Sequence, residues 1–118
     1  MMNKKKSVKP RKERAVRRCP FVASAEVTDA NSDTRLSARI SELAVGGCYV
    51  DALNPFPEGT AVTIRILRDQ GAFVTKGKVV YCHPACGMGL SFTEIEPDQR
   101  SILEEWLAEA VRELRPVS

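Results

Sequence analysis

The 118-residue sequence lacks several features that identify common classes of protein. No apolar run approaches the roughly 18 residues that a membrane-spanning helix needs. The basic N-terminus is followed by no apolar signal core, so we expect no secretion signal and a cytoplasmic location. Histidine occurs once, as His83, and no serine or cysteine stands in a recognisable nucleophile context. The sequence therefore gives no support for catalysis, and we expect a protein that is not an enzyme.

Cysteine is also sparse, and we expect reduced thiols because a chain of this length can bury its own core. Cys82, His83 and Cys86 lie close enough together to suggest zinc, but structural zinc normally takes four ligands from paired motifs. The sequence holds no second pair, and Pro84 fits a turn between strands. We therefore expect no metal site and no cofactor. The four cysteines are Cys19, Cys48, Cys82 and Cys86.

Length and composition predict one globular domain without a membrane segment. A chain of 118 residues with 43% hydrophobic and 28% charged residues falls in the usual range for a single domain. The charge is uneven, because residues 1–18 hold nine Lys or Arg and one acid, a net charge of +8. The other hundred residues hold nine bases and fourteen acids, a net charge of −5. A basic arm on a mildly acidic body should meet an anion: a ligand, nucleic acid or lipid.

The arm divides into two parts. Residues 1–12 are almost devoid of apolar side chains, so we expect this part to be flexible and residues 13–115 to form the domain. Arg14, Arg17 and Arg18 then precede the first expected strand. Their planar guanidinium groups can bind a phosphate or a guanine edge with two hydrogen bonds and can stack on a base. The run suits a nucleotide, although a solvated basic segment would have the same composition.

Alternating apolar and polar residues predict six short antiparallel strands, separated by turns rich in glycine and proline. This spacing favours a closed barrel or a sandwich, because closure removes exposed strand edges. From Pro97 the apolar period changes to three and four residues, which predicts a helix over about 97–114. Its apolar stripe should cover the barrel, and packing on a second copy is the alternative. The expected strands span residues 22–29, 35–41, 48–53, 61–67, 73–81 and 87–92.

The bend between the second and third expected strands is the point around which we interpret the chain. Gly46 and Gly47 are adjacent there, and Glu42 comes shortly before them. Adjacent glycines indicate either that the backbone needs a positive φ or that another group approaches the main chain closely. A tight turn alone would also explain them.

These features together resemble the PilZ domain family. The family's R-x-x-x-R signature falls on Arg14 and Arg18, and its D/N-x-S-x-x-G signature falls on Glu42, Ala44 and Gly47. The resemblance extends to Gly46-Gly47-Cys48-Tyr49-Val50 and to the Gly-Met-Gly-Leu-Ser-Phe-Thr run at 87–93. It implies an all-β fold, a six-stranded antiparallel barrel with a C-terminal helix.

The resemblance also implies binding of cyclic di-GMP, a bacterial second messenger, between an arginine arm and the outer surface of the barrel. Arg14 and Arg18 would contact phosphates and guanine edges, Arg17 would stack or add a contact, and Gly46 with Gly47 would let the ligand lie against the backbone. Ordering of the arm would signal to an effector protein. We expect no DNA or membrane partner, and a monomer or weak homodimer.

Two residues depart from the family pattern. Glu42 replaces Asp or Asn and is longer by one methylene, and Ala44 replaces Ser and lacks its hydroxyl. Losing one hydrogen bond costs about 0.5–1.5 kcal/mol, a two- to tenfold loss of affinity, and both changes together could cost about a hundredfold. The alternative is a PilZ module that no longer binds the nucleotide and acts only through protein contacts. Nucleic-acid binding through the arm is a weaker alternative, because the arm has no aromatic residue for base stacking.

Overall fold

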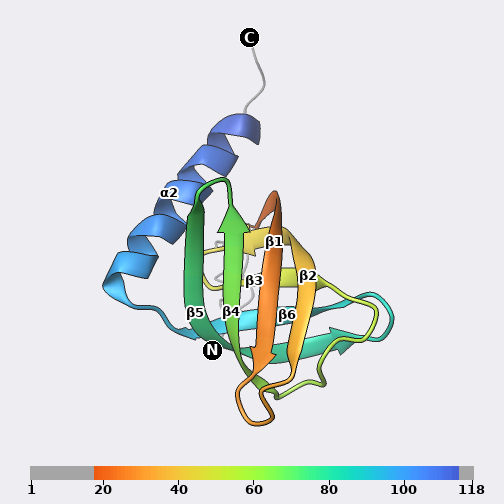
Figure 1. Cartoon of the computed structure of the whole chain (residues 1–118). Coiled ribbons are helices and arrows are strands. Elements are labelled where there is room, and N and C mark those ends of the chain that lie inside the picture. Colours follow the sequence, from red (N-terminus) through yellow and green to blue (C-terminus); the bar gives the residue numbers. More distant parts are fainter. Residues whose placement is uncertain (1–17, 115–118) are drawn as a thin grey trace, which may run out of the picture.

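The computed structural model describes residues 18–114 of the chain. Six antiparallel strands close into a barrel in the order β1-β2-β3-β6-β5-β4, and helix α2 follows them (Figure 1). The elements are β1 (Cys19–Asp29), β2 (Arg35–Ala44), β3 (Gly47–Asp51), β4 (Ala61–Arg68), β5 (Gly71–His83), β6 (Gly87–Glu94) and α2 (Pro97–Leu114). The predicted six-stranded barrel with a C-terminal helix is confirmed.

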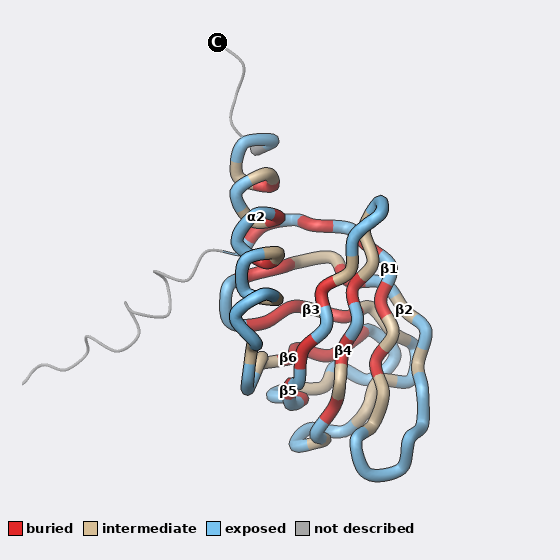
Figure 2. The backbone as a smooth tube through the Cα atoms, turned by 60° about the vertical axis from the view of Figure 1, so that its left-hand side comes forward, coloured by how far each residue is buried: buried red, intermediate tan, exposed pale blue. Residues whose placement is uncertain are grey.

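Alternation places one face of each strand in the barrel interior. In β1 the buried residues run from Cys19 to Val27 at every second position, and the same alternation recurs over residues 73–79 of β5. Figure 2 shows the buried positions of the barrel in red. The core is almost wholly apolar, and Val27, Ile40, Ile64 and Phe73 are fully buried in it. The side chains that drive closure are therefore those that the period of two had marked as inward-facing.

Several strand ends differ from the sequence prediction. β1 begins three residues earlier than expected, with a register shift between Pro20 and Ala23. β5 runs on to His83 through a shift between Val79 and Tyr81. In β5 the irregularity ends the alternation of burial after Val80, so the sequence pattern ends this strand two residues too early. In β1 burial alternates from Cys19 onward, and the start was missed because Pro20 is unusual in a strand. β3 ends at Asp51, two residues before the predicted end.

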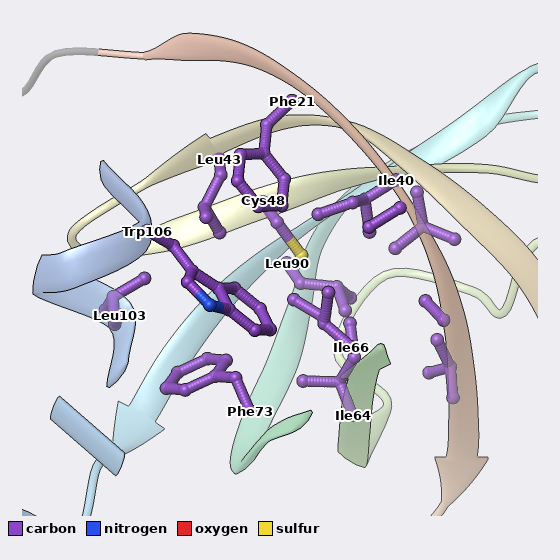
Figure 3. Close-up of a cluster of buried hydrophobic side chains, with 14 of the residues drawn as sticks. Phe21, Ile40, Leu43, Cys48, Ile64, Ile66, Phe73, Leu90, Leu103 and Trp106 are labelled. Atoms are coloured by element: carbon purple, nitrogen blue, oxygen red, sulfur yellow. The ribbon is translucent and has the colours of Figure 1, made fainter. Parts of the chain in front are cut away.

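Helix α2 packs on its own barrel, as the apolar stripe predicted. Leu103, Trp106 and Ala110 are buried, and Figure 3 shows Leu103 and Trp106 directed from the helix toward Phe73. The Trp106 ring stacks on Phe21 of β1 with centroids 5.6 Å apart and meets Phe73 of β5 edge-on at 6.4 Å. The helix therefore covers the core between β1 and β5. Among residues 18–114, no helix combines the length and apolarity needed to cross a membrane.

Candidate functional site

The bend between β2 and β3 brings the barrel wall close to β6. Ala44 pairs with Gly47 across the turn, and Gly47 in turn pairs with Ser91 of β6. A Cβ on Gly47 would overlap the carbonyl oxygen of Leu90, whereas a Cβ on Gly46 would meet nothing within 4 Å. Neither glycine has positive φ. Of the two reasons that the sequence suggested, close approach of the backbone is the one that applies, and it applies to Gly47.

Strand register arranges the outer face beside this bend into two rows, each crossing β2, β3, β6 and β5. The first row is Glu42, Tyr49, Gly89 and Tyr81, and the second is Ala44, Gly47, Ser91 and Lys78. Between the rows, four residues point to the interior and are buried, namely Leu43, Cys48, Leu90 and Val79. Val80, beside the register shift of β5, is 43% exposed. Residues that are far apart in the sequence therefore form one continuous surface on the outside of the barrel.

A hollow of about 230 Å³ lies over these rows. Arg18 and Glu42 lie at its β2 side, and Tyr81 and Val80 of β5 also line it. Five of the seven residues predicted from the sequence line the hollow, namely Arg18, Glu42, Ala44, Gly46 and Gly47. Arg14 and Arg17 lie outside the described residues. The other lining residues are Leu43, Cys48, Tyr49, Val80, Tyr81, Gly89, Leu90 and Ser91.

The charged side of the hollow is an ion pair. Arg18 Nη1 donates to Glu42 Oε1 at 3.3 Å, and the two side chains are 60% and 45% exposed. A pair this exposed contributes at most about 1 kcal/mol to stability. Arg18 therefore remains available to an anion that offers better hydrogen bonds than Glu42.

From β3 toward β5 the hollow is aromatic. Tyr49 and Tyr81 lie with ring centroids 6.2 Å apart, and the Tyr49 hydroxyl is 3.2 Å from His83 Nδ1. Partial burial raises the pKa of the Tyr49 phenol, and Cys86, Tyr81, Asp51 and Cys82 add to the shift. The phenol is therefore neutral at physiological pH and can take part in hydrogen bonding.

Cys48 lies under the hollow and is not a reactive thiol. Burial raises its pKa to about 12, so the nucleophilic thiolate is absent near neutral pH. The described cysteines are all free, with Cys19 and Cys48 buried, Cys82 partly buried and Cys86 exposed. Within residues 18–114, no group of three or more His, Cys, Asp or Glu side chains has an arrangement that could hold a metal ion.

Sequence analysis missed the other residues that β3, β5 and β6 add to the hollow, above all Tyr49, Tyr81 and Ser91. They come together because β3 pairs with β6, a contact between strands that are not consecutive. One signal was present: Gly87 and Gly89 alternate on one face of β6. Two glycines on one face of a strand leave room that side chains from neighbouring strands can cover.

Comparisons with known proteins identify the family and the fold. The sequence matches the PilZ domain family over residues 11–109, so the chain belongs to that family. PilZ domains are bacterial signalling domains of a family that binds cyclic di-GMP, and they are binding or adaptor domains rather than enzymes. No curated protein matches the sequence of this chain significantly.

Solved structures share the fold. The PilZ domain of CeSA from a cellulose-synthesising bacterium superposes with a TM-score of 0.64 at 18% identity, covering 79% of this chain and 96% of that one. The PilZ domain of YcgR from Escherichia coli, solved with cyclic di-GMP, superposes with a TM-score of 0.68 at 16% identity, covering 85% of this chain and 92% of that one. The inhibitor of motility MotI from Bacillus subtilis superposes with a TM-score of 0.69 at 16% identity. The match covers 85% of this chain but only 51% of MotI.

Proposed function

We propose that the chain is a cyclic di-GMP receptor that binds the nucleotide in the hollow beside the β2–β3 bend. The observation that carries the proposal is the convergence of Arg18, Glu42 and the Ala44–Gly47 bend on one hollow. These residues come from the two family signatures, which lie 24 residues apart at the Arg18–Glu42 contact. A cationic group, an acceptor and a closely packed backbone in one place suit a ligand with phosphates and guanine edges.

Arg14 and Arg17 would complete the site from the arm. Hydrogen bonds to charged groups contribute about 1.5–3 kcal/mol each, more than an exposed ion pair. The ligand would therefore displace Glu42 from Arg18 at a net gain, and the other arginines would add to it. Glu42 would then be free to accept a hydrogen bond from a guanine edge.

The missing hydroxyl at Ala44 has a neighbour that can offset it. Ser91 lies on the same row as Ala44, on the far side of Gly47, and lines the hollow. Its hydroxyl can donate to a phosphate oxygen or accept from a base. We propose micromolar affinity for this site, because one weakened hydrogen bond costs only two- to tenfold.

The signal would pass to an effector protein through the arm. We propose residues 1–12 as a flexible segment and 13–115 as the binding domain, with the arginines of the junction ordered by the ligand. Ordering costs a few kcal/mol, which keeps the affinity moderate and makes arm position depend on the messenger.

Calorimetric titration with cyclic di-GMP at physiological salt tests the proposal. The unaltered chain should bind saturably, and an Arg14→Ala, Arg18→Ala double variant should not. GTP serves as the control for binding of any guanine nucleotide. Absence of binding up to about 100 µM, weaker than about −5.5 kcal/mol, would overturn the proposal and leave a module that acts only through protein contacts.

A further inference from the structure

Two glycines of β6 form a floor on which the aromatic side of the hollow rests. Gly87 pairs with Asp51 of β3 and His83 of β5, and Gly89 pairs with Tyr49 and Tyr81. A Cβ on Gly89 would lie 2.8 Å from Tyr81 Cε1, and one on Gly87 would lie 2.7 Å from Tyr49 Cε2. Both distances are below 3.0 Å, shorter than the contacts that Cβ atoms make in proteins. The rings therefore lie flat across β6, in space that the absent side chains leave open.

Tyr49 is held in place from two directions. Its hydroxyl is 3.2 Å from His83 Nδ1, and its ring lies 6.0 Å from the His83 ring and 6.2 Å from the Tyr81 ring. Tyr81 also contacts His83, with centroids 5.0 Å apart. The three rings form a cluster that is fixed before any ligand arrives, so binding to it would cost little side-chain entropy.

Only part of this cluster faces the hollow. Tyr49, Tyr81 and Gly89 line it, whereas Gly87 and His83 do not. Tyr49 has its hydroxyl engaged with His83 and its ring over Gly87. Tyr81 covers Gly89, which belongs to the hollow itself. Both rings line the hollow, but only Tyr81 lies over a glycine that also lines it, and Tyr49 packs beside Tyr81.

One side of the hollow is charged and the other is aromatic, just as a nucleotide has an anionic phosphate and a flat aromatic base. The first row begins with Glu42, which contacts Arg18, and ends three strands away at Tyr81. Three strand spacings amount to roughly 14 Å. An anionic ligand group would bind at the arginine, and a flat base would lie at the tyrosine, because bases stack favourably on aromatic rings.

We infer that Tyr81, supported by Tyr49 and His83, is a stacking platform for one guanine base of the ligand. This inference rests on the proposed function and names a binding residue that neither family signature contains. It also gives the site a source of affinity that does not depend on Glu42 or Ala44. Base stacking on an aromatic side chain changes affinity by about five- to 150-fold on truncation to alanine.

Calorimetric titration of four proteins with cyclic di-GMP tests the inference: the unaltered chain, Tyr81→Phe, Tyr81→Ala and Val74→Ala. Tyr81→Phe keeps the ring and should bind within about twofold of the unaltered chain. Tyr81→Ala should bind about tenfold more weakly. Val74→Ala, at an exposed position of the same strand, should bind normally and controls for general effects on β5.

A structural role for Tyr81, as a cover for Gly89, would also make Tyr81→Ala harmful. Nuclear Overhauser effects in the unaltered chain separate the two roles, because a stacked guanine places its H8 proton close to the Tyr81 ring protons. We expect these cross-peaks in the complex. Binding by the unaltered chain with equal affinity for Tyr81→Ala, or without those cross-peaks, would overturn the inference alone. Absence of binding by the unaltered chain would overturn the proposed function and the inference with it.

Discussion

Arg18 Nη1 donates to Glu42 Oε1 at 3.3 Å, and this contact joins the residue before β1 to the outer face of β2. It joins two positions at which the sequence resembles the signatures of the PilZ family. The pair is exposed on both sides, so it orients the arginine without contributing much to stability. A mutation that removes this contact should therefore change ligand affinity with little effect on the stability of the fold.

Arg18→Ala should weaken cyclic di-GMP binding at least tenfold, because it removes hydrogen bonds between charged groups. The free energy of unfolding should change by less than about 1 kcal/mol, since an exposed ion pair contributes no more. Titration calorimetry and urea denaturation measure the two effects. Arg65→Ala, exposed on β4, makes the same change in net charge. Equal loss of affinity in both variants would mean that Arg18 acts only through overall charge.

Ala44→Ser restores the hydroxyl of the family signature. We expect it to raise affinity two- to tenfold, the value of about one hydrogen bond. Ala108→Ser, at an exposed position of α2, is the matched control and should leave affinity unchanged. Titration of both variants beside the unaltered chain decides the point. An unchanged affinity in Ala44→Ser would show that the ligand does not reach this side of the bend.

Gly47→Ala should destabilise the fold, because its Cβ would overlap the carbonyl oxygen of Leu90. Forcing a methyl group into a packed site costs typically about 1–3 kcal/mol. Gly46→Ala is a close control, since a Cβ there meets nothing within 4 Å. Urea denaturation should therefore give a lower midpoint for Gly47→Ala than for Gly46→Ala. Equal midpoints would mean that β3 and β6 can separate at this point without cost.

Cys48 should make the fold sensitive to alkali. Burial raises its pKa from 9.0 to about 12, so between these pH values the unfolded chain loses a proton that the folded chain keeps. The contribution of this group to stability is complete below pH 9 and is lost as pH rises toward 12, by at most about 1.4 kcal/mol per pH unit.

Cys48→Ala should flatten the fall in stability above pH 9, although it lowers stability at neutral pH by leaving a cavity. Chemical denaturation at several pH values measures this slope. Val50→Ala, which leaves a cavity in the same strand but removes no ionisable group, should keep the slope of the unaltered chain. A Cys48→Ala variant with an unchanged slope would contradict the assignment.

The fold could be predicted because alternation and the change of period are local signals. Strand positions such as Val27 and Ile64 needed only the period of two, and the helix boundaries at 97 and 114 agree with the prediction. The end of β5 was missed because an irregularity after Val79 interrupts the alternation. The start of β1 was missed because Pro20 is unusual in a strand, although burial alternates from Cys19 onward. Leu53 was placed in a strand for its apolar side chain, yet it is 77% exposed in a loop.

The candidate site could be predicted only in part. Glu42, Ala44 and Gly47 lie on one hairpin, where sequence spacing fixes their relation. Tyr81 and Ser91 join them through the pairing of β6 with both β3 and β5. Such pairing depends on how the whole barrel closes, so no local pattern specifies it. Gly87 and Gly89 were the available sign that neighbouring side chains cross β6 there.

The central claim is that the nucleotide occupies the hollow between the β2–β3 bend and β6. Backbone amide spectra of the isotope-labelled chain, recorded during titration with cyclic di-GMP, test it most directly. We predict the largest shifts at residues 44–47 and 89–91, with small shifts along α2. Large shifts confined to α2 or to the β4 face, or no shifts at saturating ligand, would contradict the account.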